Sequence, residues 1–353
     1  GYYDHAEREF RGFGRVEQRD TEDFEHWAKG NASNVVDAEL HQAPMRSKNW
    51  FHTGAYLRNK KILGQFEHEY WYEERARAGY PVASHPEIPL PDARIMAAEY
   101  FPANFLSTIS AEERQQAYRA CKSMALRTEV FADDAPVGSA TPAQIEKALT
   151  PYSAATHNCM VEMLQPKGQN RHAVFVVKES EAITYNYERD PADPRIAHNL
   201  NLQLDQFGNV LESAAVVYPR QMPDASLPQE TRDAQAKTVV IFSENKFTND
   251  VDSHDHYRLR LPSEVKTWEL KGVAKTGGAF YKPADFEGIL THPTTDEAFY
   301  HEIDKALVGS NAQKRLIEHV RSIFYKNDLT GALPLDKLES LGLPFENYQL
   351  AYT

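Results

Sequence analysis

Apolar and polar residues alternate in short runs along most of the chain, and turn residues lie between these runs. Alternation with a period of two is typical of β-strands, because successive side chains of a strand point to opposite faces. Gly208-Asn209 separates two of the runs and predicts a hairpin, since both residue types tolerate positive φ. The pattern predicts strands over residues 9–18, 49–57, 172–177, 182–188, 200–206, 210–218, 238–243 and 265–270.

One segment rich in helix formers interrupts the strand pattern. Ser110 and Glu113 have the spacing of a capping box, in which each side chain bonds to the backbone of the other residue. Residues 111–127 follow, and they include many residues of high helix propensity. We therefore expect a helix over this range.

A second helix is expected near the end of the chain. Thr294 and Glu297 repeat the capping-box spacing before residues 296–308, and Gly309 suits the position after a helix. Residues 315–325 fit a strand or a helix, and their β-branched and aromatic residues favour a strand.

The composition suits a large folded β domain. The chain has 353 residues, of which 41% are hydrophobic and 11% aromatic, which is enough for a sizeable core. Proline-rich stretches at residues 81–102 and 219–228 fit excursions from a sheet better than domain linkers. Gly1 leads directly into a strand-like run and residues 348–353 form another, so residues 1–353 are expected to be one internal segment of a longer protein.

An excess of acidic residues argues against nucleic acid as a partner. Lys and Arg number 39 and Asp and Glu number 51, so the net charge of −12 repels phosphate backbones. Basic residues do surround aromatic ones near Trp50, but a hairpin with one apolar and one charged face is the favoured interpretation of that mixture. No run reaches the roughly 18 apolar residues that span a membrane, so direct membrane insertion is not expected.

Few motifs suggest chemistry, and each has a simpler structural explanation. Gly12-Phe13-Gly14 begins like a dinucleotide-binding loop, but Glu17 occupies the third glycine position. In a strand, His157 and Cys159 would share a face, as metal ligands can, yet zinc needs three or four ligands and no second pair lies nearby. A Cys159 nucleophile would need a histidine base, and no local signature supplies one. Two cysteines, Cys121 and Cys159, are also too few for a disulfide framework.

Acidic clusters are equally weak signals of a site. A calcium loop needs an oxygen ligand at its fifth position and glycine at its sixth, whereas residues 250–256 have His254 and Asp255 there. A solvated turn is the favoured interpretation, with weak metal binding left open. The cluster comprises Asp250, Asp252, His254, Asp255 and His256.

Carboxylate pairs that resemble glycosidase residues are expected by chance among 51 acidic side chains. Glu179 with Glu181, and Glu302 with Asp304, are such pairs, but proximity in sequence does not place two carboxylates across a cleft. We therefore predict no catalytic, cofactor-binding or metal-binding residues.

Longer strings of residues resemble a known family. Residues 1–4 (GYYD) and 8–17 (REFRGFGRVE) are similar to the segment that follows the propeller in B components of insecticidal toxin complexes, among the SpvB-like and Rhs/YD-repeat proteins. Further strings resemble the family in the family's own order and extend over nearly the whole chain. They are residues 50–56 (WFHTGAY), 164–175 (LQPKGQNRHAVF), 185–195 (YNYERDPADPR), 205–210 (DQFGNV), 244–249 (ENKFTN) and 314–321 (KRLIEHVR).

The resemblance implies a mainly β fold, namely part of a large curved antiparallel sheet of the Rhs/YD type, with helical excursions near residues 107–128 and 294–309. It implies that the B component joins a Rhs-type C component to enclose a toxic effector, and that an upstream propeller controls release into a pore-forming A component. The implied role of this segment is a secreted, non-catalytic wall without cofactors. The self-cleaving aspartate centre of the C component has no counterpart here.

Two other classes of function stay open at this point. A carbohydrate-binding or adhesin module would present aromatic residues such as Trp27, Trp50 or Trp71 along a shallow groove. An enzyme would place carboxylates at a productive separation, or a nucleophile against a base, in a cleft.

Overall fold

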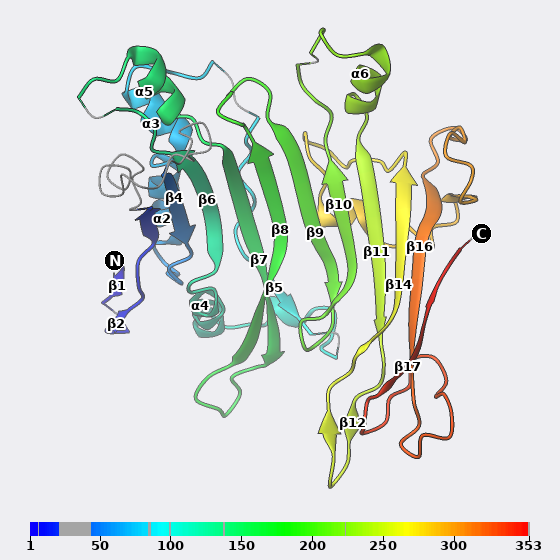
Figure 1. Cartoon of the computed structure of the whole chain (residues 1–353). Helices are drawn as coiled ribbons and strands as arrows, with labels where there is room; N and C mark the ends of the chain where they lie inside the picture. The colour runs from blue at the N-terminus through cyan, green and yellow to red at the C-terminus, as the bar shows by residue number, and fades with distance from the viewer. Residues whose placement is uncertain are drawn as a thin grey trace, which may run out of the picture. The chain divides into compact units, whose positions relative to one another are not determined.

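The computed structural model describes residues 1–5, 7–20, 44–83, 86–98, 100–136, 138–222 and 224–351. The chain forms two compact units, and Figure 1 labels helices and strands of both. Unit 1 comprises Gly1–His198 and Pro219–Ala236, and unit 2 comprises Asn199–Tyr218 and Lys237–Thr353. Strand β9 (Arg195–Leu204) contains the first boundary between them.

Unit 1 is built on strands that pair mostly antiparallel in the order β3-β4-β6-β7-β8. The longest are β7 and β8, with 13 residues each. One edge of β7 is shared: β6 pairs with Ser153–Thr156, and β5 pairs in parallel with Met160–Met163. The strands of unit 1 are β1 (Tyr3–Asp4), β2 (Glu9–Phe10), β3 (Arg15–Arg19), β4 (Met45–Phe51), β5 (Arg94–Ala97), β6 (Ala125–Ala132), β7 (Ser153–Gln165) and β8 (Val174–Asn186).

Short helices connect and cover these strands. Helix α4 packs on β7 and β8 through a small apolar core that contains Ala117, Cys121, Cys159 and Val161. The helices of unit 1 are α2 (Asn59–Glu67), α3 (Trp71–Arg77), the 3-10 turn η2 (Phe105–Ser107), α4 (Ala111–Ala120), α5 (Pro142–Ala148) and α6 (Gln229–Gln235). None of the helices in the described part of the chain has the length and apolar character that crossing a membrane requires.

Unit 2 has antiparallel strands in the order β10-β11-β14-β16. One edge of β16 is shared in the same way as that of β7, because β15 pairs in parallel with its start and β17 antiparallel with its end. Its elements are β10 (Val210–Val217), β11 (Val239–Phe247), β12 (Val251–Asp252), β13 (Tyr257–Arg258), β14 (Pro262–Lys271), η3 (Pro283–Phe286), β15 (Asp296–Ala298), β16 (Gln313–Phe324) and β17 (Pro344–Gln349).

The mainly β fold predicted from the alternation is confirmed. The hairpin at Gly208-Asn209 lies between β9 and β10, where Gly208 has a φ of 90° and the Asp205 carboxylate accepts the N–H groups of Phe207 and Asn209. The strand predicted at residues 315–325 is β16. The sheet is mixed, because β5 and β15 pair in parallel among the otherwise antiparallel strands whose pairing is described.

The two helix predictions have different outcomes. The Ser110–Glu113 capping box is present and α4 begins where predicted, but Cys121 caps its end and Ser123 has a φ of 72°, so residues 125–127 belong to β6. The helix predicted at residues 296–308 is wrong. Residues 296–298 instead pair with β16, and the Thr294 hydroxyl bonds to His292 Nδ1 where a helix cap was expected.

Candidate functional site: a buried charge ladder beside a cavity

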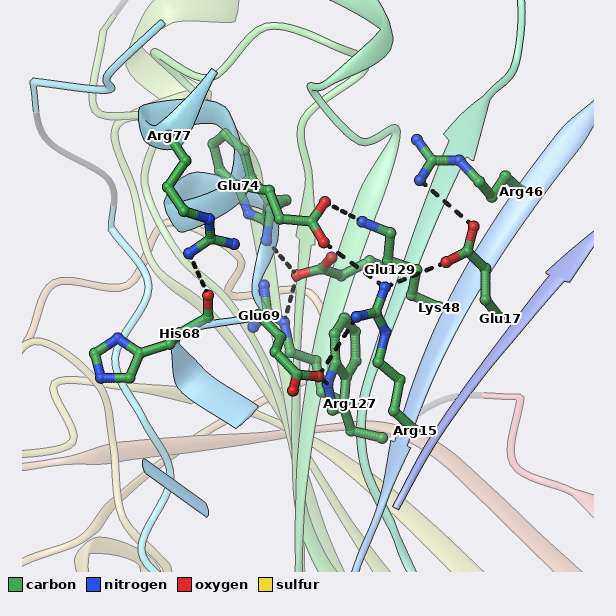
Figure 2. A network of polar contacts seen from close by, with 12 residues as sticks. Arg15, Glu17, Arg46, Lys48, His68, Glu69, Glu74, Arg77, Arg127 and Glu129 are labelled. Atoms are coloured by element: carbon green, nitrogen blue, oxygen red, sulfur yellow. Dashed lines mark hydrogen bonds and ion pairs between the residues drawn. The ribbon is translucent and has the colours of Figure 1, made fainter. Parts of the chain in front are cut away.

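Charged side chains lie on one face of three neighbouring strands of unit 1. Residues two apart in a strand point to the same face of a sheet. Two rows of residues that pair directly across β3, β4 and β6 therefore lie side by side on one face. We call this set the charge ladder. Its rows are Arg15–Trp50–Arg127 and Glu17–Lys48–Glu129. Figure 2 shows these charged side chains converging with Glu69 and Glu74, which approach from the α3 side.

Arg127 is a fully buried cation of the charge ladder. Its side chain is 1% exposed, and its Nε donates to Glu129 Oε1 at 2.8 Å while Nη1 lies 2.7 Å from Glu87 Oε2. The guanidinium carbon also lies 4.2 Å from the centre of the Tyr70 ring. A charge removed from water is tolerated only when it is paired and hydrogen-bonded. Arg127 is ion-paired with Glu87 and hydrogen-bonded to Glu129, while its Nη2 has no hydrogen-bond partner among the described residues.

The two carboxylates beside Arg127 have opposite pKa shifts. Burial alone would raise the pKa of Glu87, but Arg127 and hydrogen bonds from Trp71 Nε1 and Tyr187 Oη, each 2.7 Å long, lower it. Burial raises the pKa of Glu129, although Arg127 and the backbone N–H of Trp71 oppose that rise. Glu87 is therefore held as a carboxylate that accepts hydrogen bonds.

Lys48 and Arg15 complete the pairing of the charge ladder. Lys48 is 1% exposed and forms an ion pair with Glu74. Arg15 lies 3.2 Å from Glu17 and 3.5 Å from Glu69, and Glu69 also accepts the indole N–H of Trp50. Each cation of the ladder thus has at least one carboxylate partner, which is the arrangement of a structural network.

A cavity of about 270 Å³ lies beside the charge ladder in unit 1. His52 Nδ1 accepts the N–H of Gly54, and His52 Nε2 lies 3.6 Å from Asp92. Burial opposes ionisation of Asp92, but hydrogen bonds from His52 and the N–H of Ala93 lower its pKa. The lining residues include Glu87, Ile88, Leu90, Asp92, Leu126, Arg127, His157 and Cys159.

The cavity does not assemble a recognisable reaction centre. Glu129, whose pKa is raised, does not line it, while Glu87 and Asp92, whose pKa values are lowered, do. Cys159 faces the thiol of Cys121 at 3.8 Å, where a nucleophile would need a base. Among the residues that the structure describes, no three His, Cys, Asp or Glu side chains are placed to hold a metal ion.

The sequence candidates on β7 and β8 are separated by an irregularity in the pairing. A register shift lies between Asn158 and Cys159, so His157 lies 3.6 Å from Glu179 while Cys159 packs into the α4 core. Glu181 is buried and accepts a hydrogen bond from Asn158, whereas Glu179 is exposed. The pair Glu179 and Glu181 therefore does not face one cleft.

In the acidic cluster near residue 250, Asp250 forms an ion pair with Arg260. Arg260 bonds to both carboxylate oxygens of Asp250, and this hydrogen bonding lowers the pKa of Asp250. His254 and Asp255 bond to each other on the exposed β12–β13 turn. In the other acidic pair, Glu302 is bonded to Lys305 and to the N–H of Phe299.

The aromatic platform expected of a binding module is not present at the predicted tryptophans. Trp50 and Trp71 are 0% exposed, so neither can line a surface groove of the kind that a binding module would present, and Trp27 lies outside the described residues. Trp50 and Lys48 lie at the centre of the basic and aromatic group near residue 50, and both are buried.

Reasoning from the sequence missed the charge ladder. The helix predicted over residues 111–127 includes Arg127 and so hides the alternation of Arg127, Glu129 and Phe131 on the inward face of β6. Glu87 comes from a proline-rich loop whose position depends on tertiary contacts. The only available signal was the alternation itself, which starts directly after Met124.

Comparison with solved structures places this fold among toxin-complex chains. The crystal structure of TcdB2-TccC3 matches with a TM-score of 0.63, covering 98% of this chain and 15% of that one, at 20% identity. The TcdB2-TccC3-Cdc42 crystal structure gives a TM-score of 0.65, with 99% and 14% covered. The Tc holotoxin pore of Photorhabdus luminescens gives 0.64, with 98% and 14% covered, and these two are also 20% identical to this chain. No match was found among curated proteins.

The fold is thus that of a β-rich region within toxin-complex chains, of whose length this chain spans about one seventh. The family comparison is more specific, because residues 116–261 match the insecticide toxin TcdB middle/C-terminal region. The resemblance that the sequence suggested is confirmed in that residues 116–261 are similar to the TcdB middle/C-terminal region.

Proposed function

We propose that this chain is a single internal wall segment of a secreted toxin-complex B component, and that its work is structural. The observation that carries the proposal is the likeness of fold to TcdB2-TccC3 over 98% of the chain. The match of residues 116–261 to the TcdB middle/C-terminal region supports the same assignment.

The proposed partners follow from those relatives. The matched crystal structures pair TcdB2 with TccC3, so we infer a C component of the Rhs type as the direct partner of this chain. The match to a holotoxin pore supports an A component as the further partner, reached through the propeller that the resemblance implies upstream. In this proposal the B and C components together enclose a cytotoxic effector.

Paired charges and filled strand edges favour a wall over an enzyme. The cations of the charge ladder are bound to carboxylates, and the lowered pKa values of Glu87 and Asp92 leave neither as a general acid near neutral pH. Two further strands pair along one edge of β7 and along one edge of β16, and paired strand edges are what a durable enclosure requires. The proposed segment has no catalytic residue and no cofactor.

Electron microscopy of the full-length parent, co-expressed with the Rhs-type chain encoded beside it, tests this proposal. We expect a closed hollow particle in which the density of this segment runs continuously in the wall. A compact particle without a cavity, or a particle in which this segment projects from the wall, contradicts it.

A further inference from the structure

Two buried thiols lie against each other in unit 1. Cys121 is the C-terminal cap of α4 and Cys159 lies within β7, and their Sγ atoms are 3.8 Å apart. The residues are 0% and 4% exposed, and both thiols are free. They lie 38 positions apart in sequence, so the contact joins a helix end to one of the longest strands of the sheet.

We propose that Cys121 and Cys159 form a disulfide site, which closes when the chain folds in the presence of a disulfide donor such as oxidised glutathione. This proposal does not depend on the proposed function, because a bond between these thiols concerns unit 1 alone.

The surroundings permit a short approach of the two sulfur atoms. A disulfide requires a separation of about 2 Å, so the sulfurs must move together by somewhat less than 2 Å. Helix α4 ends at Ala120 and is capped by Cys121, and Ser123, with a φ of 72°, reverses the chain shortly after it. The proposed bond requires rotation of both side chains and a small shift of this terminal turn, and it does not require β7 to move out of its pairing.

The surroundings also favour the neutral disulfide over a charged thiolate. Ala117 and Val161 pack beside the two sulfurs, and the thiol of Cys121 contacts the carbonyl oxygen of Ala117 at 3.6 Å. A disulfide is apolar and carries no unsatisfied charge, so it suits this core. The bond would tie α4 covalently to β7 and so reinforce a contact that now depends on packing.

The chemistry is a pair of thiol–disulfide exchanges. One cysteine, as the thiolate, attacks a sulfur of oxidised glutathione, forming a mixed disulfide and releasing one glutathione thiolate. The second cysteine attacks the protein sulfur of that mixed disulfide and releases the other glutathione. The protein loses two protons and two electrons in total, and the donor disulfide is reduced to two glutathione thiols.

The timing follows from burial. The hydrogen bond with Cys159 and burial both raise the pKa of Cys121, so little thiolate is present once the core has formed. Exchange is therefore expected while the chain folds, and slow exchange is expected when oxidant is added to the folded protein.

Peptide mapping of the full-length natural chain tests the proposal. The protein is refolded from denaturant with oxidised glutathione or with dithiothreitol, and free thiols are alkylated under denaturing conditions before digestion. In the oxidised sample we expect the peptides of Cys121 and Cys159 to be recovered as one linked pair, lighter than the two separate peptides by two hydrogen atoms. Alkylated thiols in both samples, or a separate glutathione adduct on each cysteine, would overturn the proposal.

A stability measurement provides a second readout. Oxidised wild-type protein should unfold in this region about 5 °C above the reduced protein, because the bond closes a loop in the unfolded chain. The double variant Cys121→Ser/Cys159→Ser is the matched control and should unfold at the same temperature under both conditions. An equal shift in the double variant would overturn the assignment to this pair, and a variant that does not fold leaves the peptide mapping of the wild-type chain as the decisive test.

Discussion

Single residues decide how unit 1 accommodates charge in its interior. The alternation along β6 directs Arg127 and Glu129 inward, at positions where strands of this kind usually carry apolar side chains. Arg127 is stable there because Glu87 and Glu129 surround it, and each carboxylate in turn accepts further hydrogen bonds. Removing the cation should therefore be more harmful than removing an exposed arginine of the same sheet.

We predict that Arg127→Met lowers the free energy of unfolding by about 3–5 kcal/mol, because two buried carboxylates lose the cation that they share. Arg195→Met is the matched control. Arg195 also lies in a strand and pairs with a carboxylate, that of Glu188, but both side chains are more than half exposed, so the expected loss is below about 1 kcal/mol. Urea titration of both variants checks the prediction. Equal losses in the free energy of unfolding would show that the ion pairs of Arg127 stabilise the fold no more than exposed ion pairs do.

A second group of charged residues, in unit 2, should make the free energy of unfolding depend on pH. Glu264 on β14 is 3% exposed and lies opposite Lys246 and Arg321 on the neighbouring strands. Burial alone would raise its pKa, but hydrogen bonds from Lys246, Arg321 and His319 lower it to about 2 from an ordinary value of 4.5. Because the pKa is lower in the folded state, the stabilisation is complete above the ordinary value and is lost as the pH falls toward 2.

We expect Glu264→Gln to destabilise unit 2 near neutral pH, and we expect the difference from wild type to shrink as the pH falls from about 5 to about 2. The matched control is Glu318→Gln, an exposed glutamate on β16. Unfolding by urea at several pH values measures both variants. A Glu264→Gln penalty that stays constant over this range would contradict the coupling of protonation to folding.

At the scale of elements, the sequence predicts features that depend on neighbouring residues. It fails where a segment pairs with residues far away in the sequence. The Ser110–Glu113 box predicted the start of α4, because both hydrogen bonds lie within four residues. The same spacing at Thr294 and Glu297 predicted a helix where residues 296–298 pair with β16. Each of these residues pairs with one 17 positions away in sequence, and a single capping pattern contains no information about it.

Long strands were also under-predicted for a physical reason. Residues 172–177 and 182–188 were expected as two strands, yet they fall largely within β8, whose residues 180–183 are all buried. Burial on both faces removes the alternation from which a strand is recognised. The parallel strands β5 and β15 were missed because they have only four and three residues.

At the scale of the whole molecule, the proposed wall leads to a prediction about exposed apolar residues. The segment after β15 carries Phe299, Ile303 and Val308, which are 58%, 57% and 61% exposed. Several such residues close together in sequence are unusual on a surface that meets water. If the chain is a wall segment, other parts of the full-length assembly should cover residues 299–308.

Hydroxyl-radical footprinting of the assembled parent with its C component tests this coverage. We predict that Phe299 is labelled nearly as little as Phe286, which is 1% exposed, whereas both are labelled strongly in the denatured chain. Two phenylalanines are compared so that intrinsic reactivity cancels. Strong labelling of Phe299 in the native assembly would mean that this surface meets solvent, and the wall proposal would then lack an explanation for the exposed apolar residues that follow β15.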